Sequence, residues 1–156
     1  KNRMDPVRFL SRSLLKMSDN VLVKDGDFLI ARSGQVGGII GRGVWADQRF
    51  EGACVSVDVL RLSGAQSDVK AGYVFAFLCL TEVGYRQLIR GASGSSIPHI
   101  SAADALNIKL PRCNKDIELK IDLLVRKAGR WLAQAQANEN QAWSLIESVI
   151  EEQTSG

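Results

Sequence analysis

The stretch KDIELKIDLLVRKAGRWLAQAQANENQAWSLIESVIEEQ, residues Lys115 to Gln153, decides the fold of this chain. Apolar or small residues return in it at alternating intervals of four and three, which is the heptad period of a coiled-coil seam. The pattern predicts one long helix, which at about 1.5 Å per residue would span roughly 58 Å. The expected interface positions of this helix are Ile117, Ile121, Leu124, Ala128, Trp131, Ala135, Asn138, Ala142, Leu145 and Val149.

A body built from the residues before this helix is too small to cover it, since a domain of about 100 residues has a radius of gyration of about 13 Å. Most of the helix is expected to project, and its apolar face then needs a partner helix. The polar Asn138 within the seam is of a type that fixes register. The apolar stripe is widened by Trp131, Leu132, Trp143 and Ile146. A neighbour larger than one helix therefore stays open, as does a helix folded back over its own domain.

Length and composition bound the rest of the chain. Its 156 residues allow one domain, residues 1–112, followed by the helix of residues 113–153. A hydrophobic content of 46% and a charged content of 24% are typical of globular proteins. No apolar run approaches the roughly 20 residues of a membrane span, and no signal-peptide pattern is present, so we expect a cytoplasmic protein without a membrane partner. Because the chain begins at Lys1, we expect a fragment or a processed product.

Cysteine and histidine usage gives no metal-binding pattern. Cys54, Cys79 and Cys113 are odd in number and form no CxxC, and the chain has one histidine. A metal site or a disulfide framework is not expected, and the cysteines are interpreted as buried thiols in a reducing compartment. We also expect no cofactor and no catalytic residues.

Charge is distributed unevenly along the chain. Residues 1–114 carry 15 Lys and Arg against 10 Asp and Glu, a net charge of +5, whereas residues 115–156 carry 5 against 7, a net charge of −2. The globular part is therefore the basic part. This excess favours an anionic partner without proving one.

Local patterns predict an α+β body with a mixed sheet and short helices. Asp5 caps an expected short helix, strands are expected at residues 21–23, 28–31, 53–62 and 107–110, and a helix capped by Thr81 runs to Gly91. Ser101 and Asp104 have capping-box spacing. The apolar residues 71–80 fit a helix or a strand equally well. Glycine-rich residues 34–43 lack the Lys followed by Ser or Thr of a phosphate loop, so these glycines are expected to bend the chain or bring backbone close to a ligand.

Four segments, taken in order, resemble the target recognition domain of the DNA specificity subunit of type I restriction-modification enzymes. They are GDFLIARSG (Gly26 to Gly34), GYVFAFLCLTEVGYRQLIRGASG (Gly72 to Gly94), ASGSSIPHIS (Ala92 to Ser101) and NIKLP (Asn107 to Pro111), and the long helix follows them. The family domain usually has a longer N-terminal lead, and a whole subunit carries two recognition domains and two long helices. The chain thus looks like a C-terminal half of such a subunit or a stand-alone half-subunit.

The resemblance implies a non-catalytic reader of double-stranded DNA, in which each recognition domain reads half of a split target. The helices would set the spacing and dock methyltransferase (modification) subunits, and through them the restriction subunit. Two half-subunits would pair as a homodimer through the helix. Polar side chains on the glycine-rich segments are suited to base edges and phosphates. The candidate DNA-binding residues are Arg32, Ser33, Gln35, Arg42, Arg49, Arg90, Ser93, Ser95, Ser96 and His99.

Two other functions stay open from the sequence. One is a non-catalytic assembly scaffold, in which the helix is the functional part and the globular part caps it. The other is the target-recognition appendage of a larger DNA methyltransferase. A serine hydrolase is not expected, because Ser95 and Ser96 have no evident His and Asp constellation to activate them.

Overall fold

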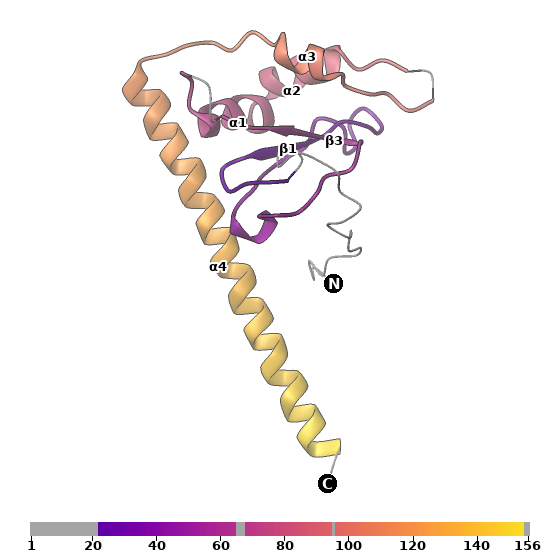
Figure 1. Cartoon of the computed structure of the whole chain (residues 1–156), viewed down its shortest axis with the longest axis vertical. Helices are drawn as coiled ribbons and strands as arrows, with labels where there is room; N and C mark the ends of the chain where they lie inside the picture. The colour runs from indigo at the N-terminus through magenta and orange to yellow at the C-terminus, as the bar shows by residue number, and fades with distance from the viewer. Residues whose placement is uncertain (1–21, 65–67, 95, 155–156) are drawn as a thin grey trace.

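The computed structural model describes residues 22–64, 68–94 and 96–154. It is α+β, as predicted: a small antiparallel sheet lies beneath short helices, and one long helix runs past both (Figure 1). The expected helix after Asp5 lies outside the described residues. The elements are β1 (Phe28–Ala31), β2 (Gly43–Trp45), a 3-10 turn η2 (Gln48–Phe50), β3 (Val59–Leu62), α1 (Ala71–Leu80), α2 (Glu82–Arg90), α3 (Ala102–Leu106) and α4 (Lys115–Thr154).

The sheet has the order β2-β1-β3, with β1 in the centre. Phe28 pairs with Trp45 of β2 on one side and with Leu62 of β3 on the other. All pairs of described strands are antiparallel, where a mixed sheet is expected from the sequence. The central strand matches the predicted residues 28–31 in both bounds.

Both faces of β1 are buried, because its side chains alternate between two cores. Phe28 and Ile30 pack against the helices, in a core that includes Phe75 and Leu88. The opposite side chain, Leu29, packs with a smaller group on the other side of the sheet. The rings of Phe28 and Trp45 each meet Phe75 edge to face, with centroids 5.8 and 5.7 Å apart. The centre of the sheet is therefore fixed by α1.

Three expected strands differ from the structure, and the open question at residues 71–80 is resolved. Of the expected strand 21–23, Leu22 forms only an isolated bridge, Val23 is in no strand, and Val21 lies outside the described residues. Only residues 59–62 of the expected strand 53–62 are in a strand, with Cys54 forming an isolated bridge to Leu22. The expected closing strand 107–110 is irregular chain. The ambiguous residues 71–80 form helix α1, which is apolar nearly all round because it is buried on most sides. The cysteines are expected to be buried, but Cys113 is exposed and Cys54 and Cys79 are half-buried.

The predicted helix caps are present. The Thr81 hydroxyl accepts a hydrogen bond from the Gly84 N–H at 3.0 Å, and α2 starts at the next residue. The Ser101 hydroxyl likewise accepts from the Asp104 N–H at 3.0 Å. Capping by a hydroxyl satisfies backbone N–H groups that have no partner within the helix, which is why local sequence sufficed to locate these starts.

Helix α4 is continuous from Lys115 to Thr154, as predicted, and is roughly 60 Å long. Its first half lies along the body, and its second half extends beyond it (Figure 1). Every described residue from 137 to 154 is exposed. The projecting part is thus smaller than expected, since the body covers the helix as far as about Gln136.

The body contacts a face of α4 that the heptad pattern did not indicate. Its buried residues are Glu118, Asp122, Val125 and Gly129. Asp122 Oδ1 accepts a hydrogen bond of 2.7 Å from the Gly72 N–H at the start of α1, and its other oxygen accepts from Arg126 at 2.8 Å. Gly129 lies so close to Trp45 that a Cβ would come within 2.8 Å of the ring. A face with two carboxylates, one valine and one glycine therefore joins α4 to the body, and the apolar seam is left free.

Glu118 makes this joint sensitive to acid. Arg112 donates hydrogen bonds of 2.8 and 3.1 Å to its carboxylate, and these bonds hold the pKa of Glu118 below its ordinary value of 4.5, although burial acts in the opposite direction. A lowered pKa in the folded state gives stability that is present above the unfolded pKa and is lost as pH falls through the folded pKa.

We therefore expect Glu118→Gln to flatten the loss of thermal stability on acidification. Melting temperatures of both proteins measured from about pH 7 down to about pH 3 test this, because a titrating carboxylate is absent from the variant. Above pH 5 the variant is expected to be the less stable protein, and below pH 4 the difference is expected to shrink. If the two melting-temperature curves were parallel at all pH values, Glu118 would not contribute to the pH dependence of stability.

Candidate nucleic-acid interface

Two glycine-containing loop segments, residues 32–43 and residues 92–101, are far apart in sequence and meet in the structure; they are called the first and the second glycine-rich segment. Ser33 and Ser93 each form an isolated antiparallel bridge with His99. The His99 N–H donates to the Ser93 carbonyl at 2.9 Å, and the Ser93 N–H donates back to the His99 carbonyl at 3.0 Å. We name the residues assembled here the Ser33–His99 cluster: Arg32, Ser33, Asp58, Ser93 and His99. Four of these five residues are candidates from the sequence.

Side-chain hydrogen bonds link three members of the cluster. The Ser33 hydroxyl lies 2.7 Å from Asp58 Oδ1 and 2.5 Å from His99 Nδ1. Asp58 and His99 are exposed, and Ser33 is half-buried. The cluster thus presents one carboxylate, one hydroxyl and one imidazole to solvent on backbone that is tied together from three chain segments.

Arg32 holds these segments together. Its guanidinium donates to the Ile100 carbonyl at 2.9 Å and to the Val57 carbonyl at 3.3 Å. Its backbone N–H also donates to the Asp58 carbonyl, and its backbone carbonyl accepts from the Ile100 N–H. Arg32 therefore has a structural role at the cluster, and its removal would loosen the geometry as well as remove a charge.

The first glycine-rich segment is held against α2. The Tyr85 hydroxyl accepts a hydrogen bond of 3.2 Å from the Gly37 N–H, and the Arg42 guanidinium lies over the Tyr85 ring, 5.4 Å from its centroid. Gly41 has φ +76°, and a Cβ there would come within 3.0 Å of the same ring. Only glycine meets both conditions without strain. Arg42 is exposed next to this turn, as is Gln35.

The other candidate residues are placed as follows. Arg90 ends α2 and is exposed, and Ser96 is exposed in the second segment. Ser95 lies outside the described residues. Arg49 is not brought to the cluster by any contact: its guanidinium pairs with Asp47 at 2.6 Å. Burial by itself would raise the pKa of Asp47, but the hydrogen bonds and charge of Arg49 outweigh it and hold the pKa below its usual value.

The serine, histidine and aspartate of the cluster are in the wrong order for a nucleophilic triad. In such a triad the histidine stands between the other two, takes the proton of the serine and is oriented by the aspartate. Here Ser33 stands between Asp58 and His99. This order suits the fixing of a side-chain orientation and does not support activation of Ser33.

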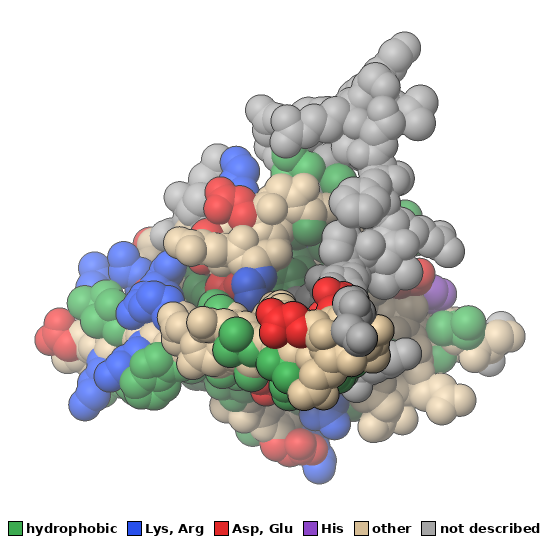
Figure 2. Space-filling view, turned by 90° about the horizontal axis from the view of Figure 1, so that it is seen from below, with side chains coloured by type: hydrophobic (Ala, Val, Ile, Leu, Met, Phe, Trp, Pro, Cys, Tyr) green, Lys and Arg blue, Asp and Glu red, His purple; other side chains and the backbone are tan. Residues whose placement is uncertain are grey.

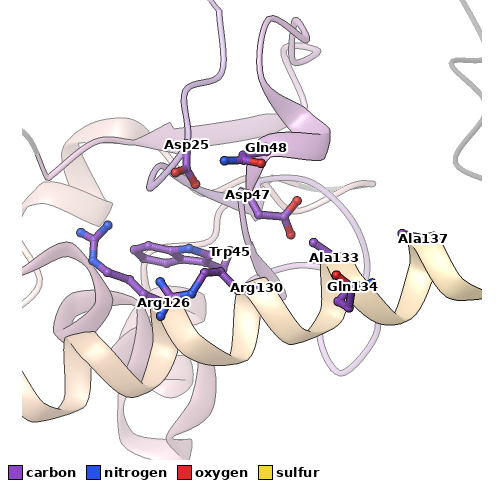
Figure 3. Close-up of a pocket in the computed structure, with 9 residues that line it drawn as sticks. All are labelled: Asp25, Trp45, Asp47, Gln48, Arg126, Arg130, Ala133, Gln134 and Ala137. Atoms are coloured by element: carbon purple, nitrogen blue, oxygen red, sulfur yellow. The ribbon is translucent and has the colours of Figure 1, made fainter.

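A separate cavity of about 310 Å³ lies at the joint between the body and α4. Figure 3 shows the Trp45 ring beside the helix, with Arg126 and Arg130 on the helix side and Asp25 and Gln48 on the body side. The Arg126 guanidinium lies 5.3 Å from the centroid of the Trp45 ring. This contact of Arg126 with Trp45 joins the helix to the body, whereas the ion pairs Arg126–Asp122 and Arg49–Asp47 each lie within one of the two parts.

The predicted helix seam is free of the body along nearly its whole length. Ile117, Leu124 and Trp131 are between 52% and 65% exposed even where α4 lies along the body, and Leu145 and Val149 are 62% and 52% exposed beyond it. The seam positions Ala128, Ala135, Asn138 and Ala142 are also exposed, and Ile121 is half-buried. The alternative of a helix folded over its own domain therefore holds only for the first half of α4, and even there the apolar seam is not buried against the body.

Charge is uneven on the surface as well. On the face shown in Figure 2, Lys and Arg side chains gather toward one side, and Asp and Glu side chains are scattered across it.

No family model matches the chain, and no curated protein shows significant similarity to it. Within the described residues, no helix is long and apolar enough to cross a membrane.

Sequence patterns did not identify two residues of this region. Asp58 lies within the expected strand 53–62, and Tyr85 lies within the helix expected from Thr81 to Gly91, where neither residue stands out. Each gains its role from a contact with a residue at least 25 positions away, Ser33 for Asp58 and Gly37 for Tyr85. No local signal could have identified either role.

Proposed function

We propose that this chain is a DNA specificity subunit, or half of one, of a type I restriction-modification enzyme. It reads one half of a split double-stranded target, works in the cytoplasm and has no catalysis of its own. Methyltransferase subunits, and through them the restriction subunit, are its protein partners. The family is proposed from the ordered motifs alone.

The observation that best supports DNA reading is the meeting of the two glycine-rich segments at the Ser33–His99 cluster. Base edges are read by polar side chains that can come close to the groove, and phosphates by cations beside them. The cluster supplies a carboxylate, a hydroxyl and an imidazole on fixed backbone, and the exposed Arg42 and Arg90 supply cations. Four residues that the motif likeness singled out, Arg32, Ser33, Ser93 and His99, thus belong to one hydrogen-bonded cluster.

The exposed seam of α4 supports the proposal that the chain pairs with a partner helix. An apolar stripe of this length is unfavourable in water, so a partner helix is the expected occupant. In a half-subunit, two copies would pair antiparallel and give a two-fold symmetric reader of a palindromic split target.

The test is the binding of the full chain to DNA with Arg42 replaced. Arg42→Ala is expected to weaken binding to a target duplex about 10- to 100-fold, because one arginine contact to DNA is worth roughly 1–3 kcal/mol. Binding of the unmodified chain should also weaken steeply as salt is raised, because phosphate contacts release counterions. Fluorescence anisotropy over a salt series measures both quantities.

Arg130→Ala is the matched control, since it removes the same charge from the α4 joint, outside the candidate residues. It is expected to leave affinity within about twofold of the unmodified chain. Equal losses in both variants would indicate a general charge effect, and binding that is indifferent to salt and to Arg42 would refute the DNA proposal. If the chain were instead an assembly scaffold, it would bind the methyltransferase subunit but not DNA.

A further inference from the structure

We propose that Ser33 and Asp58 fix His99 in the tautomer that carries its proton on Nδ1, so that Nε2 faces DNA as a hydrogen-bond acceptor and selects the amino group of adenine or cytosine. This inference rests on the proposed DNA-reading function and deepens it. It identifies Nε2 of His99 as the atom that determines specificity, and bases with an amino group as those that this atom selects.

The tautomer follows from counting protons at Ser33. Its hydroxyl carries one proton and touches two groups, Asp58 Oδ1 at 2.7 Å and His99 Nδ1. An ionised carboxylate can only accept. If Ser33 gave its proton to His99, two oxygens would face each other at 2.7 Å with no hydrogen between them, which is repulsive.

Ser33 therefore donates to Asp58, and the Nδ1–H of His99 donates to the Ser33 oxygen. A neutral imidazole carries one N–H group, so the second nitrogen, Nε2, keeps a lone pair. In this chain of bonds Ser33 and Asp58 are positioning residues for the ring of His99.

The backbone fixes where this lone pair is presented. His99 exchanges two hydrogen bonds with Ser93, at 2.9 and 3.0 Å, and the following residue, Ile100, is fully buried in the core. The His99 side chain is exposed, and no hydrogen bond joins its Nε2 to any residue in the described part of the chain. A ligand can therefore reach this nitrogen without displacing a hydrogen-bond partner from the described residues.

An acceptor is selective in the major groove. Adenine presents the N6 amino group there and cytosine the N4 amino group, whereas guanine and thymine offer acceptor oxygens at the corresponding places. Nε2 would bond either amino group and would repel O6 or O4. The geometry therefore favours adenine or cytosine at one target position.

The first experiment is independent of DNA. Long-range ¹⁵N–¹H correlation spectra of the full chain report which ring nitrogen of its single histidine is protonated, at a pH where the ring is neutral. The proton is expected on Nδ1, and Ser33→Ala is expected to make the Nε2–H form appear. Ser144→Ala, an exposed serine far along α4, is the control and should leave the spectrum unchanged. An Nε2–H ring in the unmodified chain would overturn the proposal.

The second experiment is a selection of bound duplexes from a randomised pool, made with the full chain and with His99→Ala. The unmodified chain is expected to enrich a motif in which one position is adenine or cytosine, and His99→Ala to reduce the preference there about 5- to 100-fold while the other positions persist. An enriched motif that His99→Ala leaves unchanged at every position overturns this inference alone. Failure of the unmodified chain to enrich any motif overturns the proposed function, and the base-reading role with it.

Discussion

Replacing Leu145 by aspartate is expected to weaken self-association of the chain at least about 100-fold. Leu145 is 62% exposed in the single chain and lies in the middle of the projecting seam. In a two-fold symmetric pair the change occurs twice, and each copy loses about 1.5–3 kcal/mol of leucine burial besides placing a carboxylate in an apolar interface. Sedimentation equilibrium over a micromolar concentration range measures the dissociation constant.

Two further variants make this measurement specific. Leu124→Asp lies in the same seam but alongside the body, and is expected to weaken the pair similarly. Asn140→Asp is a control, since this exposed position lies off the seam. Because Leu145 lies on the part of α4 that extends beyond the described body, its variant should have the melting temperature of the unmodified chain's body. A chain that is monomeric throughout the range would instead assign the seam to a second helix of a longer parent chain or to another subunit.

Replacing Asp122 by alanine is expected to destabilise the fold by about 2–3 kcal/mol, since its loss leaves a buried N–H of α1 without an acceptor and removes the partner of Arg126. Its carboxyl side chain is 5% exposed and joins Gly72 to Arg126. The melting temperature should fall by about 10 °C. Because the bond ties α1 to α4, the loss should also free the helix relative to the body.

Asp122→Asn separates the two contributions, because the amide oxygen can still accept from Gly72 while the ion pair is gone. It should recover about half of the stability that Asp122→Ala loses. Asp116→Ala removes an exposed carboxylate from the first turn of the same helix and should change stability by no more than about 0.5 kcal/mol. If Asp122→Ala and Asp116→Ala had equal effects, the joint would have to be held by packing alone.

The limits of sequence reasoning are visible in α4. Its bounds, its continuity and the seam from Ile117 to Val149 follow from a repeat that is read along the chain. The face that meets the body does not, because Glu118, Asp122 and Gly129 carry no hydrophobic signal. A carboxylate becomes buried only when a specific N–H or guanidinium meets it, and those partners come from α1 and the preceding loop.

The candidate site shows the same division. The glycine-rich segments, the helix caps at Thr81 and Ser101 and the polar character of the loops depend on neighbours within a few residues, so the sequence by itself determined them. The meeting of Ser33 with His99 and the contact of Asp58 with Ser33 were decided only by the tertiary structure. The physical reason is that a hydroxyl or a charge has many compatible partners along a chain, and only the folded backbone selects which of them lies within hydrogen-bonding distance.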